Sequence, residues 1–130
     1  MQYARISVRT SWPSMDYKEI TLDVSKEPSS VRVVRVGEKD VNGTVLTVNV
    51  LDHGEAFDMT DLAASLLMAF GDERYSFDGT ISGSSAVFVI DAQSMNSGST
   101  DNAYVSIEGE DFILSTGRFP VEVLESAERS

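Results

Sequence analysis

Apolar and polar residues alternate with a period of two along most of this chain. The alternation is clearest in the segments Ala4–Thr10, Glu19–Val24, Ala103–Glu108 and Phe119–Val123. A strand that buries one face in a core and leaves the other in water has this pattern, and such strands are typical of antiparallel sheets. Two further segments, Val45–Leu51 and Ala86–Ile90, are apolar on both faces or nearly so, which indicates central strands.

Turn sequences separate these segments at short intervals. Asn42-Gly43 suits a two-residue hairpin, because both central residues of a type I′ turn need positive φ. Similar breaks occur at Asp52-His53-Gly54, Gly71-Asp72-Glu73, Asp78-Gly79 and Glu108–Asp111. The longest polar stretch, Asn96–Asn102, is predicted to be a loop. About eight or nine short strands with frequent turns predict an all-β fold, either a sandwich or a barrel.

Residues 60–70 are compatible with two kinds of secondary structure. Thr60 or Asp61 could cap a helix, and the leucine, alanine and methionine residues that follow are good helix formers. Leu66, Met68 and Phe70 also share one face of a strand, and periodicity alone does not decide between the two. The neighbouring strands favour a strand from about residue 64 onward, with residues 58–62 leading into it. The alternative is a short crossover helix.

The composition argues against most catalytic chemistries. The 130 residues fit one domain, carry a formal net charge of -11, and include no cysteine and one histidine, His53. Without cysteine there is no disulfide or thiolate metal site, and the acidic balance disfavours contacts with nucleic-acid phosphates. The G-x-S-x-G, G-x-G-x-x-G and G-K-[ST] motifs are absent. We therefore predict no catalytic residue, no cofactor and no metal, and a protein that is not an enzyme.

Two polar features have plain structural explanations. His53 lies in a predicted hairpin turn and is expected to be a solvated turn residue, because no second histidine completes a common metal site. Glu108, Glu110 and Asp111 cluster around Gly109 without the EF-hand pattern. This cluster is predicted to be a charged hairpin tip that discourages pairing at the edge of the sheet.

The aromatic residues fall into two groups. Trp12 stands beside Pro13 in a connecting segment, with Met15 and Tyr17 near it. An exposed tryptophan in a loop is a common anchor for a partner, so these three residues are candidate interface residues. Alternatively, Trp12 folds back over one end of the core. The phenylalanines in strand segments are predicted to lie in the core: Phe70, Phe77, Phe88, Phe112 and Phe119.

The sequence shows neither a secretory signal nor a membrane span. Residues 1–7 have no apolar run behind the first basic residue. The longest apolar stretch, Leu62–Phe70, is far shorter than the roughly 20 residues that cross a bilayer. Unless a leader has been removed, we expect a soluble chain that is made in the cytoplasm of its host and has no membrane partner.

The order of motifs resembles that of a known family. The strand Val45–Leu51 is followed by a turn, by Glu55–Thr60, and by an apolar strand that ends at Phe70. The chain closes with Ala103–Gly109 and Leu114–Val123. This ending is similar to the pattern A-Y-x-E-I-x-G … S-T-x-x-F-x-V of the N-terminal domains of phage baseplate upper proteins. The resemblance covers about residues 17–124 and leaves residues 1–16 as an N-terminal strand and connection.

Some positions depart from the family pattern. Ala56 stands where a proline is usual, Met59 where a leucine is usual, and Gly71-Asp72 replaces a P-D-G turn. These changes are conservative for a sandwich, and they leave room for a more distant tail or adhesion module. The larger members of the family continue into a C-terminal part that carries receptor-binding proteins. The chain is therefore either a short member or a fragment of a longer reading frame.

The resemblance implies a fold and a function. The fold would be a single immunoglobulin-like antiparallel β-sandwich over residues 1–130. The function would be structural, in the tail baseplate of a phage or prophage virion, where the domain docks to neighbouring tail and baseplate proteins and positions the host-adhesion apparatus. We expect a homo-oligomer in the virion and no nucleic-acid partner. The alternative is an immunoglobulin-like module that binds carbohydrate or a cell surface, which predicts exposed aromatic residues such as Trp12 and Tyr17.

Overall fold

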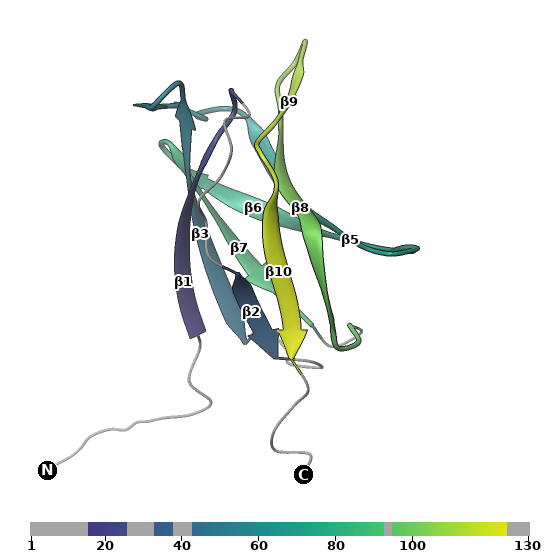
Figure 1. Ribbon diagram of the computed structural model, residues 1–130. Coiled ribbons are helices and arrows are strands. Elements are labelled where there is room, and N and C mark those ends of the chain that lie inside the picture. Colours follow the sequence, from purple (N-terminus) through teal and green to yellow (C-terminus); the bar gives the residue numbers. More distant parts are fainter. Residues whose placement is uncertain (1–15, 26–32, 38–42, 93–94, 125–130) are drawn as a thin grey trace, which may run out of the picture.

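Every regular element in the described part of the chain is a strand. The computed structural model describes residues 16–25, 33–37, 43–92 and 95–124 (Figure 1). The strands are β1 Asp16–Asp23, β2 Val34–Gly37, β3 Thr44–Asp52, β4 Glu55–Ala56, β5 Ala63–Phe70, β6 Glu73–Ser82, β7 Ser85–Ile90, β8 Gly98–Glu108, β9 Ile113–Ser115 and β10 Phe119–Leu124. The predicted all-β class is confirmed. The predicted strand Ala4–Thr10, and the residues Trp12, Met15 and Asn42, lie outside the described residues.

The strands form one continuous hydrogen-bonded path. Their order is β1-β3-β7-β6-β5-β8-β10-β2, with β4 added to β3 and β9 added to β8. The path curls into a nearly closed, barrel-like arrangement whose two ends are β1 and β2 (Figure 1). A barrel was one of the two architectures that the strand pattern indicates.

Two strand pairings are parallel, although the alternation indicates antiparallel strands. β1 runs parallel to β3 over its whole length, and β10 runs parallel to β2. Alternation depends only on which face of a strand is buried, so it carries no information about the direction of the neighbouring strand. The direction follows from the route of the chain. β1 is followed in the chain by β2, which lies at the other end of the path, so β1 and β3 are not joined by a hairpin turn and can run in the same direction.

Strand β6 belongs to both halves of the barrel. Its first part pairs with β5 up to Asp78, and its second part pairs with β7 from Gly79 onward. A strand that changes partners in this way has to bend, and a glycine is a common corner residue in curved sheets. Gly79 therefore marks the corner at which the sheet turns.

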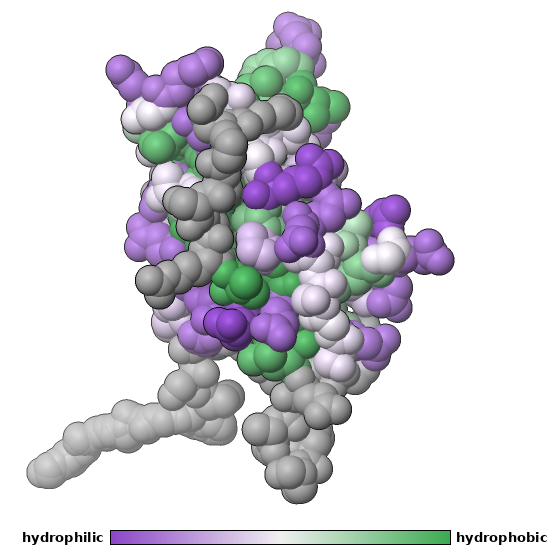
Figure 2. All heavy atoms as spheres, viewed as in Figure 1, coloured by the Kyte–Doolittle hydropathy of each residue, from purple (hydrophilic) through white to green (hydrophobic). Residues whose placement is uncertain are grey.

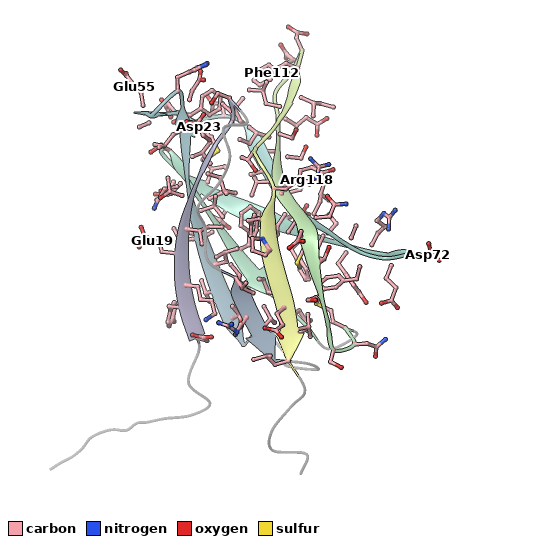
Figure 3. The ribbon with its side chains drawn as sticks, in the orientation of Figure 1. Glu19, Asp23, Glu55, Asp72, Phe112 and Arg118 are labelled. Atoms are coloured by element: carbon pink, nitrogen blue, oxygen red, sulfur yellow. The ribbon has the colours of Figure 1, made fainter. Side chains whose placement is uncertain are left out.

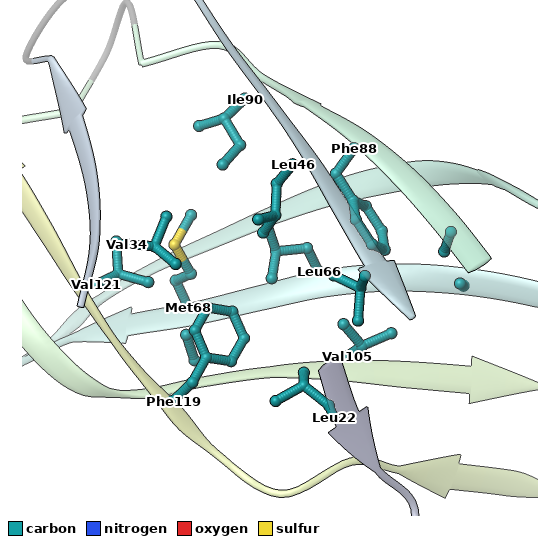
Figure 4. Packing of buried hydrophobic residues seen from close by; sticks show 14 of the residues in the cluster. Leu22, Val34, Leu46, Leu66, Met68, Phe88, Ile90, Val105, Phe119 and Val121 are labelled. Atoms are coloured by element: carbon teal, nitrogen blue, oxygen red, sulfur yellow. The ribbon is translucent and has the colours of Figure 1, made fainter. Parts of the chain in front are cut away.

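Alternate side chains of the rolled sheet point inward and form a single core (Figure 4). In β3, Leu46, Val48 and Val50 are fully buried, while the residues between them are only half-buried. Phe88 of β7 and Phe119 of β10 are the largest fully buried side chains. Because the core cluster draws residues from β1 and β2 as well as from the strands between them, the two ends of the path close over the same core.

The ambiguous segment is a strand, as the neighbouring strands indicated. β5 spans Ala63–Phe70 and pairs with β6 on one side and β8 on the other. Residues 58–62 form the turn that leads into it: the carboxylate of Asp58 accepts hydrogen bonds from the Thr60 amide at 3.0 Å and from its hydroxyl at 2.6 Å. Hydrogen bonding to a neighbour on both edges stabilises the strand by more than the helix propensity of leucine and alanine would stabilise a helix.

Three local predictions are wrong. The pair Asp78-Gly79 was predicted to be a break between strands, but β6 continues through it from Glu73 to Ser82, because Asp78 pairs with β5 and Gly79 pairs with β7. The stretch Asn96–Asn102 was predicted to be a loop, but β8 already begins at Gly98 because its first residues pair with β10. Phe112 was predicted to be core, but it is 42% exposed in the connection between β8 and β9. Among the other four phenylalanines, Phe88 and Phe119 are buried, while Phe70 and Phe77 pack against the core from half-buried positions.

Candidate functional site

A hollow of about 250 Å³ lies on the outer face of strands β5, β6 and β8. The strand register places Leu67 of β5 opposite Ser76 of β6 and Tyr104 of β8, so these three side chains share one face. Leu66 and Met68, which flank Leu67 in β5, are buried in the core, so the shared face is the outer one. The full lining is Leu67, Met68, Ala69, Arg74, Tyr75, Ser76, Asn102, Tyr104 and Arg118. We call this feature the Arg74–Arg118 hollow.

Both arginines of the hollow are held in place by neutral groups. The guanidinium of Arg118 lies 4.6 Å from the centre of the Tyr104 ring, and its Nε donates a hydrogen bond to Asn102 Oδ1. Arg74 Nη1 donates to the carbonyl oxygens of Gly71 at 2.6 Å and of Glu73 at 3.3 Å. Cation–π and carbonyl contacts position a guanidinium without neutralising its charge.

The hollow concentrates positive charge in a strongly acidic chain. Among the described residues the lysine and arginine side chains are Lys18, Arg35, Arg74 and Arg118. Lys18 pairs with Asp16 at 3.1 Å and Arg35 pairs with Glu122 at 3.2 Å. Within the described ranges, Arg74 and Arg118 have no carboxylate at ion-pair distance, and both line the same hollow. A carboxylate or another anion from a partner could pair with either guanidinium.

The connection between β8 and β9 carries the opposite charge. Glu108, Glu110 and Asp111 are exposed there, as the sequence predicts for a charged hairpin tip. Phe112 is 42% exposed and Ile113 is 68% exposed beside them. Figure 1 shows this hairpin projecting from the top of the molecule, and Figure 2 shows hydrophobic side chains directly below its hydrophilic end. We call residues 108–113 the acidic tip.

A second polar cluster has a structural role. Asp23, at the end of β1, receives backbone hydrogen bonds from Ser25 at 2.8 Å and from His53 and Gly54 at 3.0 Å each (Figure 3). Hydrogen bonding from Ser25, and then from the His53 and Gly54 amides, lowers the pKa of the Asp23 carboxyl well below its ordinary value. His53 and Gly54 have φ values of 52° and 86°, as a type I′ turn requires. The ionised carboxylate therefore ties β1 to the β3–β4 turn.

The substitution Asp23→Asn is expected to reduce stability most near neutral pH. A carboxyl whose pKa is lower in the folded state than in the unfolded state stabilises the fold above its unfolded pKa, about 3.9 for aspartate. That contribution is lost as the pH falls toward the folded-state pKa. The difference in unfolding free energy between wild type and variant should be constant above about pH 5 and should shrink below about pH 4. Urea unfolding at a series of pH values measures this difference.

Asp72→Asn is the matched control for that experiment, because it removes an exposed carboxylate from the turn between β5 and β6 and so reports the effect of net charge. If the gap between wild type and Asp23→Asn stays the same from neutral to acid pH, the Asp23 carboxylate does not hold the turn through its charge.

The predicted site residues lie apart from the hollow wherever the structure describes them. Tyr17, in β1, is 73% exposed and does not line the hollow. Trp12 and Met15 lie outside the described residues. His53 is an exposed turn residue, as predicted, and its Nδ1 lies 2.9 Å from Asp52 Oδ1. In the described part of the chain, no group of three or more His, Cys, Asp or Glu residues could hold a metal ion. Nor does that part contain a helix long and apolar enough to cross a membrane.

Sequence reasoning did not identify the residues of the hollow. Arg74, Tyr104 and Arg118 belong to different strands or connections, and only strand pairing brings them together. The one available signal was the scarcity of positive charge, since 10 basic residues stand against 21 acidic ones. The scarcity of positive charge draws attention to every arginine, but it does not show which arginines lie close together in the fold.

Comparison with known proteins gives a family match and a structural match. The model of the BppU N-terminal domain family, the N-terminal domain of baseplate upper proteins, matches residues 15–130. The fold is similar to that of the N-terminal domain of phage TP901-1 ORF48, with a TM-score of 0.62 at 16% sequence identity. That match covers 85% of this chain and 98% of the other. No curated protein matches the chain.

Proposed function

Because this chain belongs to the BppU N-terminal domain family of phage baseplate upper proteins, we propose that it docks onto neighbouring baseplate subunits and positions the host-adhesion apparatus. The family match gives it a structural role in the phage baseplate, and it confirms the resemblance that the motifs indicated. The proposal assigns no catalytic step to the domain. Such a role needs a rigid body with exposed contact surfaces, which a nearly closed barrel around one core supplies.

The Arg74–Arg118 hollow is the observation that carries the docking proposal. Arginine and tyrosine are enriched where protein partners bind, because each offers a large contact area together with directed hydrogen bonds. The two arginines have no carboxylate partner among the described residues, so a partner's acidic group can complete the site. The many acidic side chains of the protein repel like-charged surfaces, which favours approach of an acidic partner at the hollow.

The edge of the barrel at β1 is proposed as a second contact. Tyr17 projects from this strand with 73% of its surface exposed. β1 ends the path of the described strands, and no strand in the described residues pairs with its outer edge, so we propose that this edge can pair with another chain. Trp12 and Met15 precede Tyr17 in the sequence, and we include them in this proposed contact.

The docking role predicts a defect in assembled particles. Virions made from a genome that lacks this reading frame should have incomplete baseplates in electron micrographs, and wild-type protein supplied in trans should restore them. Protein with Arg74→Glu and Arg118→Glu should restore them poorly, because like charges now face the partner's acidic group. Protein with Arg35→Glu is the matched control, since Arg35 lies outside the hollow and pairs with Glu122 within the molecule.

Complete baseplates without the reading frame would overturn the proposed function. If the purified chain instead binds a glycan, and Tyr17→Ala abolishes that binding, the alternative of a carbohydrate- or cell-surface-binding module gains support. That alternative requires an exposed aromatic residue, and Tyr17 meets this requirement.

A further inference from the structure

We propose that the Arg74–Arg118 hollow of one copy receives the acidic tip of a second copy of this chain. The inference rests on the proposed function, because it names the neighbouring subunit that fills the hollow. It starts from the charges of the two surfaces. The hollow has two guanidinium groups without a carboxylate partner among the described residues, and the tip has three exposed carboxylates, Glu108, Glu110 and Asp111.

The apolar parts of the two surfaces also match. Phe112 and Ile113 stand 42% and 68% exposed beside the carboxylates of the tip. The hollow presents Leu67 and the ring of Tyr104 beside its arginines. An aromatic side chain with acidic neighbours therefore meets an aromatic and aliphatic surface with basic neighbours. Burying Phe112 and Ile113 there would remove the exposed apolar surface of the tip from water.

The hollow is smaller than the pockets that bury drug-sized molecules. Pockets that bury drug-sized molecules have volumes of about 300–1,000 Å³. The hollow has about 250 Å³, which lies below that range and suits one or two side chains of a protruding hairpin.

The tip cannot reach the hollow of its own molecule. Both belong to β8, with Tyr104 in the hollow and Glu108 at the base of the tip. At roughly 3.4 Å per residue these positions are about 14 Å apart along an extended strand. Pairing of Ala63 with Glu108 keeps β8 extended to its end, so the tip points away from the hollow. The contact therefore joins two molecules through different surfaces, and repeated contacts of this kind close into rings or continue as filaments.

Sedimentation analysis of the purified chain and two variants tests this contact. The tip variant carries Glu110→Ala, Asp111→Ala and Phe112→Ala, and the hollow variant carries Arg74→Ala and Arg118→Ala. We expect wild type to self-associate at protein concentrations up to about 1 mM and to dissociate in high salt. Each variant should sediment as a monomer when alone. An equimolar mixture should form a complex, because the intact tip of one variant meets the intact hollow of the other.

The matched control carries Asp52→Ala and Glu55→Ala, which remove two exposed carboxylates from the β3–β4 hairpin, and it should self-associate like wild type. Circular dichroism spectra that match wild type show that each variant has folded. A monomeric wild type, variants that associate like wild type, or a mixture that stays monomeric would each overturn the inference. None of these results changes the interpretation of the electron micrographs of virions. Incomplete baseplates on loss of the reading frame would still support the proposed function.

Discussion

Gly79→Ala is expected to destabilise the protein by about 3 kcal/mol, near the upper end for adding a methyl group to a packed core. A Cβ atom at this position would lie 2.5 Å from Cε1 and 2.9 Å from Cζ of Phe88. Phe88 is fully buried, so its ring cannot move aside without displacing the core around it. At about 4 °C per kcal/mol for a domain of this size, the melting temperature should fall by roughly 12 °C. Thermal unfolding followed by circular dichroism measures the change.

The chain contains a matched control for this substitution. A Cβ atom at Gly109 would meet Cε1 of Phe112, a similarly close contact with the same ring atom. Phe112 is 42% exposed, so its ring can rotate into solvent. Gly109→Ala should therefore change stability by less than about 1 kcal/mol. If both substitutions destabilise equally, burial of the opposing ring is not the cause.

A double substitution tests the contact directly. Phe88→Leu removes the ring atoms that the new methyl group meets, at the cost of a smaller core side chain. The double variant Gly79→Ala with Phe88→Leu should therefore lose less stability than the sum of the two single losses. A strictly additive result would show that the two positions do not interact.

Thr116→Val is expected to cost about 2–3 kcal/mol, although the two side chains have nearly the same shape. Thr116 is fully buried, and its hydroxyl accepts a hydrogen bond from the Val105 amide at 3.0 Å and donates one to the Gly117 carbonyl at 2.9 Å. The ladder between β8 and β9 ends just before this residue, so the hydroxyl takes the place of the next backbone acceptor. Valine would leave the Val105 amide buried without a partner. Urea unfolding measures the loss of stability.

Thr116→Ser separates the hydrogen bonds from the packing. Serine keeps the hydroxyl and loses one methyl group, so it should cost only about 1 kcal/mol. Amide hydrogen exchange adds a local readout, because the Val105 amide should exchange faster in the valine variant than in the serine variant. If valine proves no more destabilising than serine, the hydroxyl does not complete the ladder.

The position of most strands could be predicted because a strand with one buried face alternates apolar and polar residues along the sequence. The segments Glu19–Val24, Val45–Leu51 and Phe119–Val123 overlap β1, β3 and β10, and each alternates between buried and more exposed side chains. Phe112 shows the limit of this reasoning. Its sequence context does not distinguish a core position from a hairpin tip that projects beyond the barrel.

The candidate site was less predictable than the fold. Tyr17 was chosen because it is aromatic and lies near Trp12, and its exposure agrees with a contact role. Arg74 and Arg118 are 44 positions apart in the chain, and their common hollow exists only because β5 pairs with both β6 and β8. An arginine without a carboxylate partner can be recognised only when its neighbours in space are known, and those neighbours come from distant segments of the chain.

The sequence by itself determined most of the strands, most of the turns, and the family with its structural role in the baseplate. Each of these depends on local patterns, such as a period of two, a glycine at a turn or the closing motif that includes Thr116. Only the tertiary structure decided that β1 and β3 are parallel, that Gly79 faces the Phe88 ring, and that two arginines share one hollow. Strand pairing joins segments that are distant in the chain, and alternation records only the buried face of each strand, without its partner or direction.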